Sequence, residues 1–554
     1  KPVLHVVRDV PPLPPDWLEL VGVAARYYHA PLGEVVALAL PPGLRRANDV
    51  SEADIDPWLA ISPEGQTALD SPRRPSRSLT LLRTLATMSL PLRRSQIRAL
   101  EDGEQVGDLL RRGWLVASAA PRAGQSAQEL PTLTPAQQTV MEAFAHGPQD
   151  FAVWLLQGVT GSGKTEIYLR LAARVLAAGQ QVLMLVPEIA LTPQLEARVQ
   201  QRFPYAHIVS LHSGLAAGAR SRGFVQALSG RADIVLGTRL AVFTPLPRLG
   251  LILLDEEHDT SYKQQEGVRY SARDLAVWRG RQRNVPVVLG SATPSLESWL
   301  HARDGRYRHL HLATRAVASA LPDVRCLDTR RSKLQEGLSE GLLQAIEQRL
   351  ARGEQSLVFL NRRGYAPVLS CPACGWLSEC PHCSAKRVVH LADKRLRCHH
   401  CGCESAIPHA CPQCGEQDIR PLGRGTQRVE AFLNERFPQA RILRVDRDST
   451  RTRSQWETLL ATIARGEMDI LVGTQMMAKG HDFPALTLVG VVGADASLYA
   501  ADFRAPERLF QQLMQVGGRA GRAQLAGEVL IQTEFPDYPL FQFLKQHDFD
   551  GFAA

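Results

Sequence analysis

Residues 158–165 read GVTGSGKT, and this stretch decides the fold. It matches the phosphate-loop pattern G-x-x-x-x-G-K-[ST], follows an apolar run at 151–157 that predicts a buried strand, and opens into a predicted helix at 166–178. In such a loop the glycines let backbone N–H groups close around phosphate oxygens, and the helix N-terminus adds positive potential. We therefore predict an α/β domain that binds a nucleoside triphosphate.

The residues of this loop have expected contacts with ATP. Lys164 is expected to reach the β and γ phosphates, and the Thr165 hydroxyl to bind the Mg²⁺ ion that accompanies ATP. Upstream, Gln137 is placed to contact the adenine edge, although a helix-capping box at Thr134 explains the same residues equally well. The other predicted ATP-binding residues are Gly158, Thr160, Gly161, Ser162 and Gly163.

An acidic block supplies what hydrolysis needs beyond nucleotide binding. The apolar run 251–254 predicts a buried strand and ends directly in Asp255 and Glu256. By position, Asp255 is expected to hold Mg²⁺ through its water shell, and Glu256 to polarise the attacking water. A surface acidic turn is the alternative, but it explains poorly why two carboxylates end a buried strand.

Short apolar runs alternate with predicted helices along most of the chain. This pattern is typical of parallel sheets that are buried on both faces. We therefore predict the α/β fold class, with two lobes that each contain a parallel sheet. The predicted strands of the first lobe lie at 151–157, 181–186, 233–237, 249–254 and 286–290, and those of the second at 356–360, 441–445, 469–473, 486–492 and 527–532.

Eight of the ten cysteines form four C-x-x-C pairs between Cys371 and Cys414. In a reducing compartment such pairs bind metal, and since tetrahedral Zn²⁺ takes four thiolates, we predict two closed structural zinc sites. Strand-like runs at 387–391 and 395–398 indicate a zinc-ribbon hairpin, which favours one of the three possible groupings; Cys403 is a possible decoy. The predicted sites are Cys380, Cys383, Cys398 and Cys401 for one ion, and Cys371, Cys374, Cys411 and Cys414 for the other.

Composition and charge favour a globular protein of several domains. The 554 residues exceed what one hydrophobic core normally serves, and 45% of them are hydrophobic and 22% charged. The net charge of +8 suits a polyanionic partner, and an ordinary basic cytosolic protein equally well. We find no apolar run of membrane-spanning length and no signal peptide, so we expect a cytoplasmic protein without membrane contact.

The segment 71–100 contains seven arginines and no acidic residue. It lies in a region whose pattern indicates a small unit of helices and a hairpin. A winged-helix DNA-binding unit would present such a surface, and a solvated basic face is the alternative. The arginines are Arg73, Arg74, Arg77, Arg83, Arg93, Arg94 and Arg98.

Several blocks in a fixed order carry a family resemblance. Together with the cysteine pairs, they resemble the PriA family of primosomal replication-restart helicases, in superfamily 2, over roughly residues 1–554. The resemblance implies an ATP-dependent 3′–5′ DNA helicase that recognises stalled or abandoned replication forks and initiates primosome assembly. The blocks are GVTGSGKTE (158–166), DEEHDTSYKQQEG (255–267), GSATPS (290–295), LVFLNRRGY (357–365), GTQMMAKGHDFP (473–484) and GGRAGRA (517–523).

Further site residues follow from this resemblance alone. It implies that Arg519 and Arg522 reach the γ-phosphate from the second lobe. Residues 259–273, here called the coupling loop, resemble the aromatic-rich loop that couples DNA binding to ATP hydrolysis. Its tyrosines are expected to stack on bases, although Val268 and Ser271 stand where some relatives have tryptophan and histidine. The predicted coupling residues are Tyr262, Lys263, Arg269 and Tyr270.

The resemblance also implies a domain organisation: two P-loop helicase lobes, a winged-helix-like unit and a two-zinc module inserted in the second lobe. We expect only the tail of the family's N-terminal DNA-binding domain and no further C-terminal domain, so fork recognition is expected to be impaired. The expected parts are 1–48 (tail of the DNA-binding domain), 50–122 (winged-helix-like), 130–318 (lobe 1), 319–370 (lobe 2, first part), 371–417 (two-zinc module) and 418–554 (lobe 2, second part).

The resemblance also implies binding partners, and the sequence leaves two alternative functions open. Forked and single-stranded DNA, single-stranded-DNA-binding protein and the proteins that load the replicative helicase are the implied partners, in the bacterial cytoplasm and away from any membrane. One alternative is a DNA-dependent ATPase that translocates without separating strands. Another is a fork-binding zinc scaffold with a vestigial motor, which the intact Lys164, Asp255 and Glu256 disfavour. The acidic block reads DEEH, which disfavours an RNA helicase only weakly.

Overall fold

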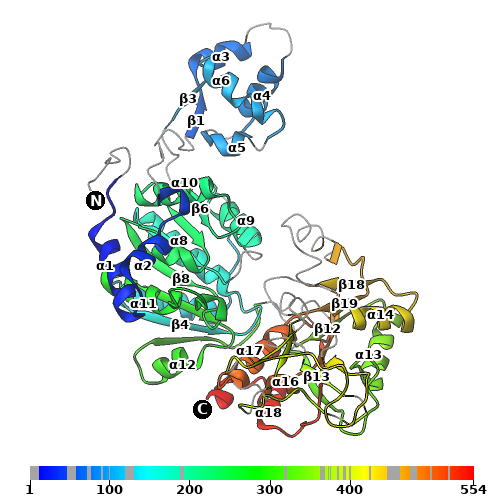
Figure 1. The fold of residues 1–554 in the computed structure, drawn as a ribbon. Helices are drawn as coiled ribbons and strands as arrows, with labels where there is room; N and C mark the ends of the chain where they lie inside the picture. Colours follow the sequence, from blue (N-terminus) through cyan, green and yellow to red (C-terminus); the bar gives the residue numbers. More distant parts are fainter. Residues whose placement is uncertain are drawn as a thin grey trace. The chain divides into compact units, whose positions relative to one another are not determined.

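A computed structural model describes most of the chain (Figure 1). The chain divides into two compact units, Lys1–Leu156 with Lys164–Ser291 and Asp304–Leu310, and Gln157–Gly163 with Ala292–Arg303 and His311–Ala554. The described residues are 11–45, 58–70, 76–88, 91–98, 100–118, 130–187, 192–316, 321–361, 368–371, 373–374, 376–383, 386–390, 395–398, 401–422, 426–445, 459, 462–463, 465–474, 483, 485–498, 502–521 and 525–554.

The first unit is built on a seven-stranded sheet with the order β10-β4-β9-β8-β5-β7-β6. The central strands β5, β7, β8 and β9 pair in parallel and are buried along their whole length, as apolar runs on both faces require. The strands are β4 (Val153–Gly158), β5 (Gln181–Leu185), β6 (Ile208–Leu211), β7 (Ile234–Gly237), β8 (Leu249–Leu254), β9 (Val287–Ser291) and β10 (Arg308–Leu312).

Helices alternate with these strands and begin at recognisable sequence signals. The Ser271 hydroxyl accepts the N–H of Asp274 and so caps α11, which ends at Asn284 in the left-handed conformation. The described helices of the first unit here are α7 (Pro135–His146), α8 (Lys164–Ala177), α9 (Thr192–Arg202), α10 (Ala217–Leu228) and α11 (Ala272–Arg283), with the 3₁₀ turns η5 (Arg239–Phe243) and η6 (Thr260–Tyr262). The helix α12 (Leu296–Arg303) follows β9 in the sequence and belongs to the second unit.

Two N-terminal helices, blue in Figure 1, pack against the first unit: α1 (Pro15–Tyr27) and α2 (Leu32–Ala39). Trp17 is 2% exposed and donates its indole N–H to the carbonyl oxygen of Phe243 at 2.6 Å. The carboxylate of Asp16 pairs with Arg283 at 3.1 Å. These contacts fix the N-terminal helices to α11 and η5. The 3₁₀ turn η1 (Pro42–Leu44) follows them.

The arginine-rich region forms a small unit with its own core. Three antiparallel strands form a sheet in the order β2-β1-β3. Buried leucines of the neighbouring helices, among them Leu82 and Leu85, form the hydrophobic core. This is the helix-and-hairpin composition predicted for the region. The elements are β1 (Trp58–Ile61), α3 (Pro63–Asp70), α4 (Arg77–Ala86), β2 (Leu92–Arg93), α5 (Arg94–Arg98), η3 (Gly103–Gln105), α6 (Val106–Arg111) and β3 (Leu115–Ala117).

The second unit contains a six-stranded parallel sheet with the order β11-β21-β20-β12-β19-β18. The helices α13 (Glu340–Ala351) and α14 (Thr426–Arg436) contribute to its core, and α17 (Ala505–Gly517) precedes β21. The remaining elements are β11 (Asp323–Asp328), β12 (Gln355–Leu360), β18 (Ile442–Val445), β19 (Ile470–Gly473), β20 (Leu486–Val492), β21 (Glu528–Thr533), α16 (Asp495–Leu498), α18 (Pro539–Lys545) and α19 (Phe549–Ala553).

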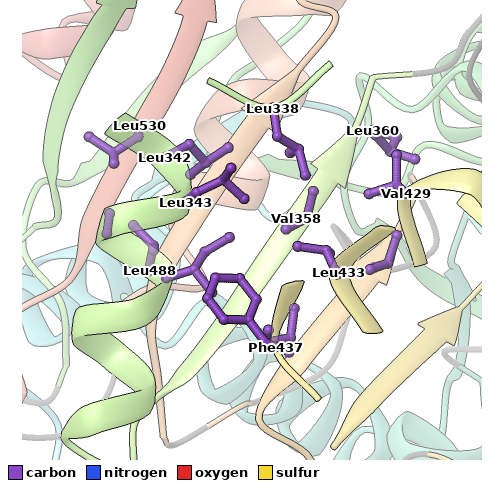
Figure 2. Packing of buried hydrophobic residues seen from close by; sticks show 14 residues of the cluster. Leu338, Leu342, Leu343, Val358, Leu360, Val429, Leu433, Phe437, Leu488 and Leu530 are labelled. Carbon is purple, nitrogen blue, oxygen red and sulfur yellow. The ribbon is translucent and has the colours of Figure 1, made fainter. Parts of the chain in front are cut away.

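Figure 2 shows the hydrophobic core of this second sheet. Leu342 and Leu343 of α13 and Leu433 of α14 meet Val358 of β12, and all four are fully buried. Truncating one such leucine to alanine costs about 2–5 kcal/mol. The six-stranded sheet therefore has a large hydrophobic core that contains no cysteine.

A five-stranded antiparallel sheet, here called the cysteine module, is inserted between β12 and α14. Its buried hydrophobic cluster contains only Leu369, Val389 and Leu396 among the described residues. So small a core contributes little to folding. The strands are β13 (Val368–Ser370), β14 (Val388–His390), β15 (Arg395–Arg397), β16 (Glu404–Ala406) and β17 (Arg420–Leu422).

Among the residues that the structure describes, no helix combines the length and the apolarity that crossing a bilayer requires.

Candidate ATPase and metal centres

The phosphate loop follows β4, whose six residues are all buried. Gly161 and Gly163 each have a φ of 84°, a left-handed conformation that a side chain would strain. The Ser162 N–H donates to the carbonyl oxygen of Val159 at 3.0 Å and closes the turn. Lys164 then begins α8 and is only 9% exposed. The backbone thus has the form that cradling a phosphate requires, while the contacts of single residues with ATP stay predictions.

Asp255 stands directly after β8, another fully buried strand. Its N–H donates to the carbonyl oxygen of Leu185 at 3.0 Å, which fixes it beside β5. Desolvation and the neighbouring Glu256 carboxylate together raise the pKa of the Asp255 carboxyl to about 6, against the ammonium of Lys164, which acts in the opposite direction. The phosphate-loop lysine and the predicted metal-binding carboxylate therefore interact electrostatically, as an ATPase site requires.

Tyr168 is a site residue that the sequence reasoning missed. It is 1% exposed, and its hydroxyl donates to Oδ1 of Asp255 at 3.1 Å. Tyr168 follows Lys164 by four residues on α8, so both lie on the same helix face, and this spacing is the signal that could have found it. A Cβ atom at Gly290 would overlap the Tyr168 hydroxyl. The glycine of the GSATPS block thus makes room for this hydrogen bond.

The acidic block is tied to the GSATPS block by two hydrogen bonds. The N–H of Glu257 donates to the carbonyl oxygen of Gly290 at 3.0 Å, and Nδ1 of His258 lies 2.7 Å from the Ser291 hydroxyl. Glu256 has a φ of 47°, which is strained for a residue with a side chain and costs on the order of 1–3 kcal/mol. Strain of this kind is concentrated at functional sites, which agrees with a role of Glu256 in activating water.

The two tyrosines of the coupling loop do not have the environment that we predicted. Tyr262 is 2% and Tyr270 0% exposed, so neither ring is accessible to a stacking base. The Tyr262 hydroxyl lies 2.8 Å from the carbonyl oxygen of Asp255, and the Tyr270 ring packs edge-on against Phe243 at 5.1 Å. The predicted base stacking is therefore wrong for this conformation. Both buried rings thus have the environment of core residues, and the hydroxyl of Tyr262 is hydrogen-bonded as well.

Lys263 and Arg269 are the exposed basic residues of the coupling loop, which also exposes the acidic Glu266. The Lys263 ammonium donates to the carbonyl oxygen of Arg269 and lies 5.1 Å from the ring centre of Tyr28. Val268 is 5% exposed and Ser271 caps α11, so both positions at which relatives differ are structural here. Contact of the two basic residues with DNA stays a prediction.

Gln137 forms the capping box that was the alternative to adenine binding. Its side-chain oxygen accepts the Thr134 N–H at 2.9 Å, and its own N–H donates to the Thr134 hydroxyl at 3.3 Å. The side chain is 4% exposed. The capping function is therefore confirmed, and the adenine contact stays a prediction.

Of the two arginines expected near the γ-phosphate, the structure describes only Arg519. Arg519 follows α17, donates its N–H to the carbonyl oxygen of Val516 at 3.1 Å, and is 7% exposed. Arg522 lies outside the described residues. Their predicted contact with ATP is not tested by this geometry.

The eight paired cysteines form two tetrads with the predicted grouping. In each tetrad all four sulfur atoms lie within 4.8 Å of one another. Neighbouring Sγ atoms are 3.4–3.6 Å apart, close to the roughly 3.8 Å that tetrahedral zinc with 2.3 Å bonds would set. Cys403 belongs to neither tetrad. The tetrads are Cys371, Cys374, Cys411 and Cys414, and Cys380, Cys383, Cys398 and Cys401.

Three arginines of the cysteine module are engaged inside it. Arg395 and Arg397 both pair with Glu404, at 2.9 and 2.6 Å. Arg387 donates to the carbonyl oxygen of Glu379 at 3.0 Å. These ion pairs hold β15 against β16, so the positive charge there is partly neutralised.

The arginines of segment 71–100 are neutralised in part by an acidic residue that follows this segment within the same small unit. Arg77 lies 3.3 Å from Glu104, which comes after the acid-free segment. Arg83 and Arg98 are exposed and have room to meet a phosphate backbone. The DNA-binding and solvated-face interpretations both remain compatible with this surface.

These features define a class of protein. Two parallel α/β sheets, a phosphate loop, and a strand-end acidic block tied to a GSAT block make an ATP-driven motor of the helicase type. Family models agree: the DEAD/DEAH box helicase model matches residues 134–300, the helicase conserved C-terminal domain model matches 422–524, and the 3′DNA-binding domain (3′BD) model matches 1–41. The chain is an ATP-dependent DNA helicase with two cysteine tetrads in its second unit.

The chain belongs to the family of replication restart proteins PriA. It is 42% identical to the replication restart protein PriA of Haemophilus influenzae, over all of this chain and 77% of that protein. It is 45% identical to the Bacillus subtilis protein of the same name, over 72% of this chain and 50% of that one. A structure of the Mycobacterium smegmatis helicase Lhr with ssDNA and AMP-PNP is 17% identical, with a TM-score of 0.46 over 75% of this chain and 48% of that one.

Proposed function

We propose that the chain unwinds DNA at stalled or abandoned replication forks, moving 3′ to 5′, and initiates the primosome assembly from which replication restarts. Family membership and the match of residues 1–41 to a 3′ DNA-binding domain support the fork assignment. The observation that carries the motor is the placement of Lys164 at the start of α8 and of Asp255 directly after the buried strand β8, where the Lys164 ammonium lowers the pKa of the Asp255 carboxyl. A protein that had lost its motor would not need to keep this pair.

The proposed chemistry assigns one task to each site residue. Lys164 binds the β and γ phosphates, while Thr165 and Asp255 hold the Mg²⁺ ion of MgATP. Glu256 takes a proton from the attacking water. Arg519 and Arg522 stabilise the charge that develops on the γ-phosphate, an effect of about 10³–10⁵ in rate for arginine fingers.

We infer that each cysteine tetrad holds one Zn²⁺ ion. The sulfur spacing supports this, since four thiolates at tetrahedral separation leave no open position for catalysis. The ions would therefore be structural. Folding of the cysteine module would depend on them, because its described apolar core contains only Leu369, Val389 and Leu396.

The proposed partners follow from the same assignment. Forked and single-stranded DNA are the substrates, and the exposed Arg83, Arg98 and Arg269 are available for phosphate contacts. Single-stranded-DNA-binding protein and the proteins that load the replicative helicase are the protein partners, in the bacterial cytoplasm. The name of the relatives, replication restart protein, supports this setting.

Rates of ATP hydrolysis on single-stranded, duplex and forked DNA test the proposal. We expect forked DNA to stimulate hydrolysis most and blunt duplex least. Lys164→Ala should lower the stimulated rate at least about a hundredfold, because a positioned cation on developing charge is worth that much. Equal stimulation by all three DNAs would contradict fork recognition while leaving the motor intact.

A strand-displacement assay on a labelled fork separates unwinding from its alternatives. We expect ATP-dependent release of one strand by the wild type and none by Lys164→Ala. Stimulated ATP hydrolysis without strand release would instead identify a translocase. Restart activity that survives Lys164→Ala would identify a fork-binding scaffold.

A further inference from the structure

The N-terminal helices and the coupling loop meet at one residue, Tyr28. It follows α1 directly, and its N–H donates to the carbonyl oxygen of Ala24 as the helix ends. The Tyr28 hydroxyl accepts the backbone N–H of Ser271 at 3.1 Å, and its ring lies beneath the Lys263 ammonium at 5.1 Å. One side chain thus contacts both Lys263 and Ser271, the two residues between which the exposed part of the coupling loop lies, here called the neck of the loop.

The contacted residues are themselves paired. Lys263 and Ser271 form an antiparallel bridge, and the N–H of Gln264 donates to the carbonyl oxygen of Tyr270 at 2.9 Å. Residues 265–267 between these contacts are exposed. Tyr28 therefore contacts the loop at its closed base, where a small shift would move the whole exposed tip.

From this base, the loop leads inward to the hydrolytic site. Tyr262 precedes Lys263 and places its hydroxyl 2.8 Å from the carbonyl oxygen of Asp255 and 3.0 Å from that of Leu185. Since the Asp255 N–H is bonded to the same Leu185 carbonyl group, the backbone of the metal-binding residue is held from both sides. A continuous set of contacts therefore joins Tyr28 to Asp255.

A second route begins at the same helices. Trp17 bonds to the carbonyl oxygen of Phe243, and the ring of Phe243 packs against Tyr270 at the end of the loop. Buried Arg279 holds the carbonyl groups on both sides of Phe243, those of Val242 and Thr244. The N-terminal helices thus support the coupling loop through packing as well as through the Tyr28 hydrogen bond.

We propose that Tyr28 is a positioning residue through which DNA held by the N-terminal segment sets the rate of ATP hydrolysis. The inference rests on the proposed function, since it presumes that DNA stimulates the ATPase. The matched 3′DNA-binding region, residues 1–41, contains Tyr28, while the loop that Tyr28 braces ends at the catalytic block. Tyr28 itself touches neither ATP nor the attacking water. Burial raises the pKa of its phenol to about 12, so the hydroxyl stays neutral in solution near pH 7.

The test is Tyr28→Phe in the full chain, which removes the acceptor for the Ser271 N–H and keeps the ring over which Lys263 lies. The ATPase rate is measured without DNA and over a series of fork concentrations. We expect the rate without DNA to stay within about twofold and the maximal stimulation to fall about three- to tenfold, as loss of one buried hydrogen bond permits. Fork affinity, measured by fluorescence anisotropy without ATP, should not change.

Tyr27→Phe is the matched control. It removes the hydroxyl oxygen from the neighbouring tyrosine, which is 70% exposed. DNA should stimulate ATP hydrolysis by this variant as strongly as by the wild type. If Tyr28→Phe lowered the ATPase rates with and without DNA equally, Tyr28 would have a merely structural role, and the inference would be overturned. Full stimulation of Tyr28→Phe by DNA would overturn it as well. A wild type that DNA does not stimulate would instead contradict the proposed function, so the two failures are distinguishable.

A double-mutant cycle with Lys263→Met gives an independent measurement. If Tyr28 acts through the neck of the loop, Tyr28→Leu and Lys263→Met should together lower stimulation by clearly less than the product of their separate effects. Additive losses would mean that the two side chains act separately, and would overturn the proposed route.

Discussion

The phenol of Tyr168 donates a hydrogen bond to Oδ1 of Asp255 over 3.1 Å. Tyr168 is fully buried, and its bond favours the ionised carboxylate, as does the ammonium of Lys164. Desolvation and the Glu256 carboxylate act against both and raise the pKa of Asp255 to about 6. The pKa of the carboxyl that we propose to hold Mg²⁺ in its ionised form thus lies only about one unit below neutral pH.

The first prediction concerns the pH dependence that this relationship sets. Because the protonated form of Asp255 cannot bind the metal, kcat/KM for MgATP should fall as the pH drops through about 6. Tyr168→Phe removes a contact that lowers the pKa, so the pKa should rise and the acid limb should move to higher pH. The expected displacement is about half a unit to one unit. Initial rates at limiting MgATP between pH 5 and 8 measure it.

Tyr205→Phe is the control for this experiment. Tyr205 belongs to the same unit and is partly exposed, and its loss should leave the profile unchanged. Protonation of ATP itself is the same in every variant, so only the displacement between profiles counts. An acid limb of Tyr168→Phe that coincides with the wild-type limb would show that this bond does not tune the Asp255 carboxyl.

The second prediction tests the room that Gly290 leaves for Tyr168. A Cβ atom there would overlap the Tyr168 hydroxyl, so Gly290→Ala should displace the ring or strain β9. Overpacking of this kind costs about 1–3 kcal/mol in the free energy of unfolding. Urea denaturation should detect this loss, and ATP hydrolysis should fall as well.

Gly33→Ala is the matched control, because a Cβ atom at Gly33 in α2 meets no atom within 4 Å. That variant should be as stable as the wild type or more stable, since alanine favours the helix by up to about 1 kcal/mol. Combining Gly290→Ala with Tyr168→Phe should restore part of the lost stability, because the overlapping hydroxyl is then absent. Strictly additive losses would place the strain elsewhere.

The site could be predicted from the sequence where backbone motifs define it, and not where tertiary packing does. GVTGSGKT and the acidic block lie at the strand ends that their apolar flanks predicted. Tyr168 was missed because its spacing from Lys164 indicates only a shared helix face and not a hydrogen bond to Asp255, which lies 87 residues away in sequence. Tyr262 and Tyr270 were assigned to DNA because tyrosines beside basic residues look alike whether the rings face solvent or the core.

The same distinction holds for the fold. The buried central strands β8 and β20 were predicted with the bounds that the structure shows. Three strands of the seven- and six-stranded sheets were missed: β6 and β11 are only half-buried, and β10, with the sequence RHLHL, is largely exposed. Each lies at the edge of its sheet, so one-sided burial leaves too few apolar residues to reveal it.

The third prediction separates the metal ligands from Cys403. Cys398 is fully buried within its tetrad, so Cys398→Ser should lower the bound zinc from about two ions to about one per chain. Cys403→Ser should leave it near two, because Cys403 lies outside both tetrads. Mass spectrometry of the metal in purified protein gives the count. Zinc loss in the Cys403 variant would mean that the grouping is different.

The fourth prediction concerns the order in which functions fail when metal is withdrawn. The described core of the cysteine module is the small Leu369, Val389 and Leu396 cluster, whereas the second sheet has the large cluster in Figure 2. Structural zinc contributes on the order of 10–16 kcal/mol in finger peptides, so the module should unfold without it while both sheets persist. Fork unwinding should therefore be lost before nucleotide binding.

A chelator selective for zinc over magnesium, added with Mg²⁺ in excess, tests this order. Strand displacement and binding of a fluorescent ATP analogue are followed in the same samples, and added zinc should restore displacement. The phosphate loop and Asp255 are held by β4 and β8, which contain no cysteine, so their site has no direct dependence on the metal. Simultaneous loss of both activities would show that the cysteine module and the motor fold as one unit.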